Sequence, residues 1–60
     1  MPKPKILILE DQKMIRKNFA EMLTLWGYDV VAVKDGVEGV QAVKVADAQG
    51  EPFNLYFSDV

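Results

Sequence analysis

Acidic side chains directly follow two of the apolar runs in this sequence. Glu10 and Asp11 come after residues 6–9 (ILIL), and Asp59 comes after residues 53–58 (FNLYFS). The chain has no cysteine and no histidine, which excludes thiolate and imidazole nucleophiles and the zinc sites built from those residues. The metal chemistry left to this chain is therefore that of carboxylate oxygens, which suit hard cations such as Mg²⁺.

Three strands are expected to position these acids. Residues 6–9 form an apolar run without alternation, typical of a strand covered on both faces in a parallel sheet. Residues 28–33 (YDVVAV) are β-branched and apolar, and residues 53–58 alternate. We expect Phe53, Leu55 and Phe57 to share one face of the third strand.

Two helices are expected between the strands. The first carries an apolar stripe, predicted to be buried, and ends at Gly27 as a C-terminal cap; the stripe comprises Ile15, Phe19, Met22, Leu23 and Trp26. Asp35 and Glu38 have the spacing of a capping box, which predicts a helix from there to about Ala48. Its predicted buried stripe consists of Val37, Val40 and Val43.

The order strand, helix, strand, helix, strand predicts an α/β fold with a parallel sheet and right-handed crossovers. The apolar first strand favours the central position, which gives the sheet order 2-1-3. Ligands of such sheets bind beyond the carboxyl ends of the strands, where Glu10, Asp11 and Asp59 would converge. Converging carboxylates raise each other's pKa unless a cation lies among them, so the sequence predicts a Mg²⁺ and phosphoryl site.

These residues resemble the receiver domain of two-component response regulators. The matching stretches are ILILEDQ, LWGYDVVAVKDGVEGV and FNLYFSDV. The resemblance covers the whole chain but only about the first half of a receiver. It implies that residues 1–60 are a truncated receiver domain, a βαβαβ half of a flavodoxin-like fold.

The resemblance also implies roles for the acids. Asp59 matches the phosphoacceptor, which takes a phosphoryl group from a histidine kinase, a phosphotransfer protein or a small acyl phosphate. Asp11 matches a direct Mg²⁺ ligand, and Glu10 matches the second acid of the pair, where the family usually has Asp. Such a protein is a phosphoacceptor in a phosphorelay and not an independent enzyme. The family's later Ser or Thr, its Lys, and the loop carbonyl that completes the Mg²⁺ shell have no counterpart in these 60 residues.

Composition limits the partners that we expect. The net charge of −2 gives no electrostatic footprint for nucleic acid, and the apolar run at residues 6–9 is too short for a membrane span, so we expect a cytoplasmic protein. A chain of this length buries only about 60% of its unfolded surface. We therefore expect a homodimer formed through the free edge of the third strand. Two functions remain open: a phosphoacceptor signalling module and a phosphorylation-incompetent, self-associating structural module.

Overall fold

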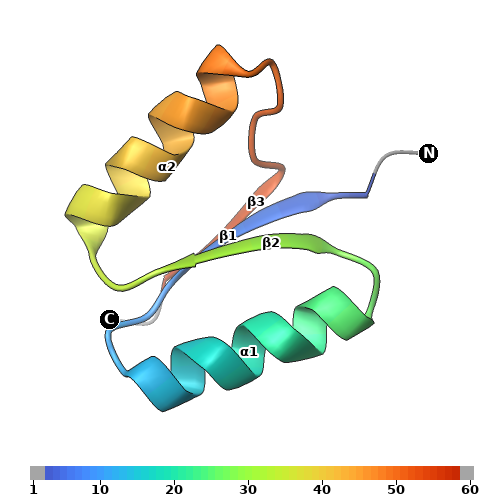
Figure 1. Ribbon diagram of the computed structural model, residues 1–60, viewed down its shortest axis with the longest axis vertical. Helices are drawn as coiled ribbons and strands as arrows, with labels where there is room; N and C mark the ends of the chain where they lie inside the picture. The colour runs from blue at the N-terminus through green and yellow to red at the C-terminus, as the bar shows by residue number, and fades with distance from the viewer. Residues whose placement is uncertain (1–2, 59–60) are drawn as a thin grey trace.

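The computed structural model describes residues 3–58, and they form a parallel sheet flanked by helices (Figure 1). In chain order the elements are β1 (Lys5–Leu9), α1 (Lys13–Leu25), β2 (Asp29–Val33), α2 (Gly36–Ala48) and β3 (Leu55–Ser58). The strands lie in the order β2-β1-β3, and β1 pairs in parallel with both neighbours. The predicted α/β class, connectivity and sheet order are thus confirmed.

The sheet separates the apolar core into two clusters, because α1 lies on one face of the sheet and α2 on the other (Figure 1). Successive residues of β1 point to opposite faces of the sheet, so they enter the two clusters in turn. The α1 cluster has Ile6, Ile8 and Leu23 as its buried members. The α2 cluster has Leu7, Val33, Ala46 and Phe53 as its buried members.

Local hydrogen bonds set the helix ends. Asp35 accepts a hydrogen bond from the Glu38 N–H at 2.9 Å, which is the predicted cap of α2. The Glu38 carboxylate accepts a hydrogen bond from the Lys34 N–H at 3.2 Å. In a standard capping box it would accept from the N–H of the cap residue, here Asp35. At the end of α1, Gly27 has φ +95°, and the Tyr28 N–H donates to the Leu23 carbonyl at 3.1 Å. The predicted glycine cap therefore forms.

The stripe predicted for α1 is buried only in its middle. Leu23 is buried and Phe19 is half-buried, but Ile15 and Met22 are about two-fifths exposed and Trp26 is 67% exposed. The expectation that Trp26 belongs to the core is wrong. Trp26 is the residue that follows the last residue of α1, where the chain turns toward β2, so it has left the face that the periodicity places against the sheet.

The buried face of α2 is also different from the predicted one. Val37 and Val40 are exposed, and only Val43 of the predicted stripe packs against the core. The fully buried positions are Gly39 and Ala46. Small residues face the sheet because α2 approaches it closely: a Cβ added at Gly39 would lie 3.5 Å from the Leu9 Cδ1. Periodicity in hydrophobic residues could not reveal a face built from glycine and alanine.

The third strand is shorter than predicted, and its first residue is Leu55. Asn54 interrupts the alternation before it: its side-chain oxygen accepts from the Lys5 N–H at 2.8 Å, and its own N–H donates to the Lys5 carbonyl at 2.7 Å. As a result Phe53 enters the α2 cluster, whereas Phe57 contacts Phe19 of α1 with ring centroids 5.8 Å apart. The prediction that Phe53 and Phe57 share a face is wrong.

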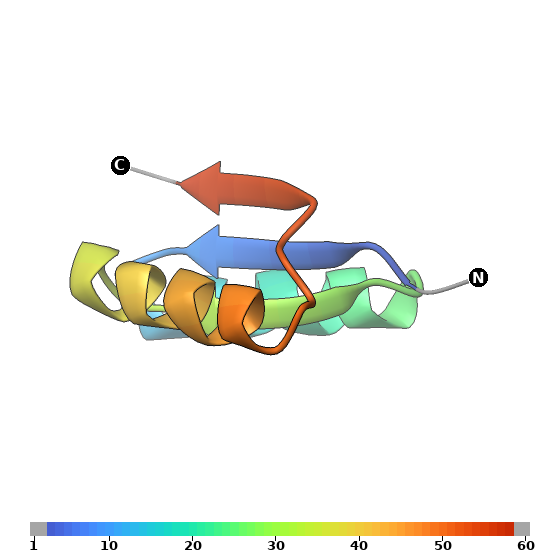
Figure 2. The same cartoon turned by 90° about the horizontal axis from the view of Figure 1, so that it is seen from above.

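Figure 2 shows that β3 projects beyond both helices, which lie over β1 and β2. All four residues of β3 are accordingly exposed, including the large side chains of Leu55, Tyr56 and Phe57. Within residues 3–58, no helix is long and apolar enough to cross a membrane.

Candidate functional site

The candidate site lies at the carboxyl ends of β1 and β3, which are adjacent in the sheet. Leu9 is the register partner of Ser58, the last described residue of β3. Glu10 and Asp11 follow Leu9 directly in the sequence, and Asp59 follows Ser58. Asp59 itself lies outside the described residues. The parallel register thus places the acidic pair one residue beyond the point where the two strand ends meet.

Glu10 is held by its backbone and by its side chain. Its N–H donates to the Val33 carbonyl at 3.0 Å, which extends the β1–β2 ladder by one residue. Its carboxylate Oε1 accepts from the Gln12 N–H at 3.1 Å, near the N-terminus of α1. The side chain is buried, with the residue only 4% exposed. A carboxylate is thus fixed in a largely water-excluded position at the candidate site.

Asp11 differs from Glu10 in its environment, because it is exposed in the turn between β1 and α1. A short and accessible carboxylate of this kind can bind a cation that keeps most of its water ligands. Glu10 and Asp11 are therefore two acids with different roles available to them. The buried one is held by the backbone, and the exposed one is open to solvent.

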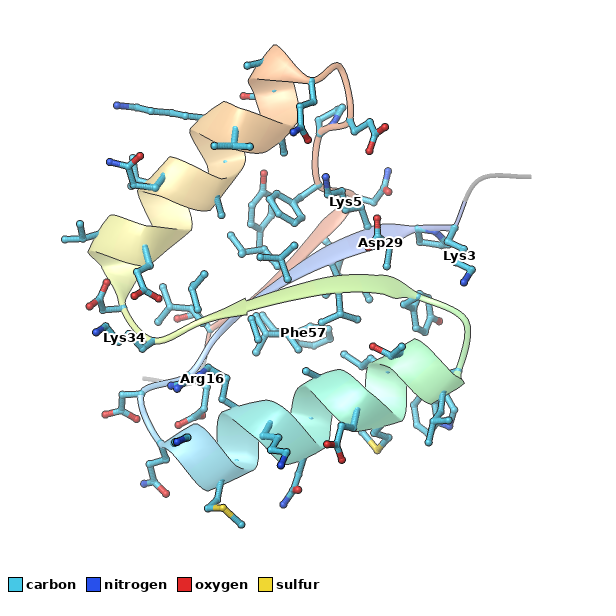
Figure 3. The ribbon with its side chains drawn as sticks, in the orientation of Figure 1. Lys3, Lys5, Arg16, Asp29, Lys34 and Phe57 are labelled. Carbon is cyan, nitrogen blue, oxygen red and sulfur yellow. The ribbon has the colours of Figure 1, made fainter. Side chains whose placement is uncertain are left out.

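Arg16 is a further residue of this site, and the sequence analysis did not identify it. Its Nη1 donates to the Glu10 carbonyl at 2.9 Å, and the side chain is half-buried (Figure 3). The contact links the first turn of α1 to the end of β1 and brings a permanent positive charge next to the acidic pair. The spacing of six residues across a turn has no recognised motif, so no sequence signal indicated it.

Lys34 follows the carboxyl end of β2 at the same edge of the sheet as Arg16 (Figure 3). Its Nζ lies 3.7 Å from the Glu38 carboxylate, and both side chains are largely exposed. An exposed pair of this kind contributes little to stability. It does place a further cation at the edge where the acids lie.

A hollow of about 160 Å³ adjoins Glu10 on the α1 side of the sheet. Glu10 and Ser58 supply its polar lining. The remaining wall is apolar and consists of Ile8, Leu9, Ile15, Phe19 and Phe57. The buried Glu10 carboxylate therefore borders an apolar space instead of open water.

A three-carboxylate metal site is not found among residues 3–58, where no three acidic, histidine or cysteine side chains group closely enough to hold a metal. The predicted set of Glu10, Asp11 and Asp59 includes one residue outside that range, so this observation does not test the prediction. Glu10 and Asp11 are the members of the predicted set that the structure describes.

The chain is 39% identical over 44 residues to "Probable transcriptional regulator ycf27" from Porphyridium aerugineum. The aligned part is 73% of this chain and 18% of that protein, so the chain spans less than a fifth of its relative. No family model matches the chain, and no solved structure matches it. The identity shows that most of this chain is similar to a short part of that protein.

Proposed function

We propose that this chain is a receiver-type phosphoacceptor module of a two-component phosphorelay, with Asp59 as the phosphoacceptor. The observation that carries the proposal is the register between Leu9 and Ser58. It makes Glu10-Asp11 and Asp59 the residues that come next on two adjacent parallel strands, the edge at which ligands of α/β sheets bind. The partial identity to a probable transcriptional regulator supports the same proposal.

The donor set suits Mg²⁺. Glu10, Asp11 and Asp59 offer carboxylate oxygens only, and Mg²⁺ is commonly held by one or two carboxylates, several waters and a phosphate. Asp11 is exposed and would bind the ion directly, whereas Glu10 is buried and would act through an ordered water or at the rim. When bound, Mg²⁺ would neutralise charge on the phosphoryl oxygens.

In this reaction Asp59 would be the nucleophile, and the acidic pair would hold the Mg²⁺ that stabilises the transferred phosphoryl group. An Asp59 carboxylate oxygen would attack the phosphorus of a phosphohistidine or a small acyl phosphate, and the bond between phosphorus and the donor's nitrogen or oxygen would break. The phosphoryl group then resides on Asp59 as an acyl phosphate, and the donor leaves as histidine or a carboxylate. A histidine kinase or phosphotransfer protein would supply the phosphoryl group in the cytoplasm.

Intact mass spectrometry after incubation with acetyl phosphate and Mg²⁺ tests the proposal. We expect the chain to gain the mass of one phosphoryl group, and we expect Asp59→Asn to gain none. Removing Mg²⁺ with a chelator should abolish the gain in the unmodified chain. A gain that persists in Asp59→Asn would show that another residue is the nucleophile.

The acidic pair can be tested separately from the nucleophile. Asp11→Asn removes an exposed charge, so it should leave folding intact. It should raise the Mg²⁺ concentration needed for half-maximal labelling by tenfold or more. Asp47→Asn, an exposed acid on α2, is the matched control. Equal Mg²⁺ dependence in the two variants would contradict the metal assignment of Asp11.

A further inference from the structure

The turn between β1 and α1 carries Asp11, the exposed carboxylate of the candidate site. Among the hydrogen bonds within residues 3–58, none involves Asp11 itself. Hydrogen bonds instead hold the residues on either side of it. The direction of the Asp11 carboxylate therefore depends on how firmly its two flanking peptide units are fixed.

Each of these two peptide units is held by a hydrogen bond. The carbonyl of the unit that precedes Asp11 belongs to Glu10, and it accepts from Arg16 Nη1 at 2.9 Å. The N–H of the unit that follows Asp11 belongs to Gln12, and it donates to Glu10 Oε1 at 3.1 Å. Because peptide units are planar, the orientations of the two flanking units set the backbone torsion angles of the residue between them. The two bonds together thus fix the backbone of Asp11.

Arg16 holds this turn at a second point. Its backbone N–H donates to the Gln12 carbonyl at 2.9 Å, so one residue contacts the chain on both sides of Asp11. Glu10 is anchored in turn, because its N–H donates to the Val33 carbonyl at 3.0 Å. The turn is therefore tied to α1 through Arg16 and to the sheet through Glu10.

The side-chain bond from Arg16 is of the stronger kind. Its donor is a charged guanidinium, and hydrogen bonds with an ionised donor are about twice as strong as neutral ones. The side chain is half-buried, and Figure 3 shows it at the end of α1 that lies nearest the carboxyl end of β1. Lys17 carries the same charge one residue later but is exposed, which makes it a matched control.

The charge of Arg16 and its hydrogen bond have opposite effects on a cation at Asp11. A positive charge close to the site repels Mg²⁺ and weakens binding. A fixed backbone strengthens binding, because less conformational freedom is lost when the ion binds. Loss of Arg16 weakens binding only if the positioning effect is the larger one, so the sign of the change distinguishes the two.

We propose that Arg16 is a positioning residue, which orients the Asp11 carboxylate toward the cation by holding the Glu10 carbonyl. The inference rests on the proposed function, in which Asp11 binds Mg²⁺ directly. Loss of a residue that orients a metal ligand typically lowers metal affinity by about 10–100-fold. Arg16 acts through a backbone carbonyl, so we expect an effect of about tenfold, at the low end of this range.

A magnesium titration followed by NMR tests this effect without a phosphoryl donor. The probe is MgCl₂ alone, and the amide resonances of Asp11 and Gln12 report binding. We expect Arg16→Met to raise the Kd for Mg²⁺ about tenfold. Lys17→Met removes an exposed, screened charge, so it should change the Kd by less than about twofold. Arg16→Lys keeps the charge and a donor but not the planar fork, so its Kd should lie between those of the unmodified chain and Arg16→Met.

Backbone order parameters of the metal-free chain separate positioning from general destabilisation. In the unmodified chain the N–H order parameters of Asp11 and Gln12 should be about 0.85, the value of rigid backbone. In Arg16→Met they should fall below about 0.6, while those of β1 stay unchanged. A lower free energy of unfolding alone would leave the order of the folded state unaltered.

The outcomes separate this inference from the proposed function. An unchanged or lower Kd in Arg16→Met, or unchanged order at Asp11, would overturn the inference and leave the proposed function standing. If the unmodified chain shows no saturable Mg²⁺ shifts, the metal assignment of Asp11 fails and the inference fails with it. Phosphoryl uptake at Asp59 is read independently by mass.

If Arg16→Met does not fold, Arg16→Lys decides the question with the same two measurements. A raised Kd for Mg²⁺ together with lower order at Asp11 would support the inference. An unchanged Kd in Arg16→Lys would overturn it.

Discussion

At the scale of single residues, Asp35 is the clearest local determinant of structure. Its side chain accepts the Glu38 N–H at 2.9 Å at the start of α2. α2 needs this contact more than most helices because it contains Gly36, Gly39 and four valines, all weaker helix formers than alanine. We expect Asp35→Ala to lower the free energy of unfolding by about 1 kcal/mol, measured by urea titration. Asp35→Ser, which keeps a capping oxygen, should lose less than half of that.

Arg16 is expected to matter for stability in a way that its neighbour does not. Its guanidinium is half-buried and donates to the Glu10 carbonyl at 2.9 Å, whereas Lys17 is exposed. Arg16→Met keeps most of the apolar length and removes the hydrogen bond, so we expect a loss of about 1–2 kcal/mol by the same titration. Lys17→Met should change stability by less than about 0.5 kcal/mol. Equal effects would show that the contact with Glu10 contributes nothing.

The candidate acids were predictable from sequence because their signal is local: acids directly after apolar runs. Arg16 was not, because its contact depends on how the turn from Glu10 to Lys13 folds back on the end of β1. The burial of Glu10 could not be predicted from the sequence pattern either. Glu10 borders a hollow whose lining includes Ile15, Phe19 and Phe57, and these residues belong to separate elements.

At the scale of elements, the strand and helix periodicities predicted which segments form which element, but the buried face of α2 could be found only from the three-dimensional structure. Apolar periodicity favoured Val37 and Val40, and the helix instead turns Gly39 and Ala46 to the sheet. Small residues carry almost no hydrophobic signal, yet they permit the close approach of α2 to Leu9 and Val33.

Gly39 offers a prediction about this helix. A Cβ at this position would lie 3.5 Å from the Leu9 Cδ1 and 3.8 Å from the Val33 Cγ2, both ordinary contacts. Gly39→Ala should therefore stabilise the protein by up to about 1 kcal/mol through helix propensity. Gly27→Ala is the contrasting variant: at φ +95° an alanine is strained, so it should destabilise by about 1 kcal/mol. Thermal unfolding of the two variants should shift in opposite directions.

At the scale of the whole molecule, the exposure of Trp26 provides a direct check of the core. Trp26 is the sole tryptophan and is 67% exposed, while Leu23 in the preceding turn is 5% exposed. Tryptophan emission should therefore shift little on unfolding, so circular dichroism must follow the transition. Trp26→Ala should cost less than about 1 kcal/mol, whereas Leu23→Ala should cost about 2–5 kcal/mol and unfold most of the population. Comparable losses would place Trp26 in the core after all.

Because the sheet divides the core into two clusters, the effect of a substitution in one cluster on stability should be nearly independent of substitutions in the other. Leu23 belongs to one cluster and Ala46 to the other, and the sheet lies between the two clusters. Substitutions on opposite sides should therefore combine additively, whereas substitutions on the same side should interact. The exceptions are β1 and β2, whose consecutive residues enter alternate clusters. A backbone change in either of these strands would affect both clusters at once, whereas a substitution in one helix should affect mainly the cluster that the helix covers.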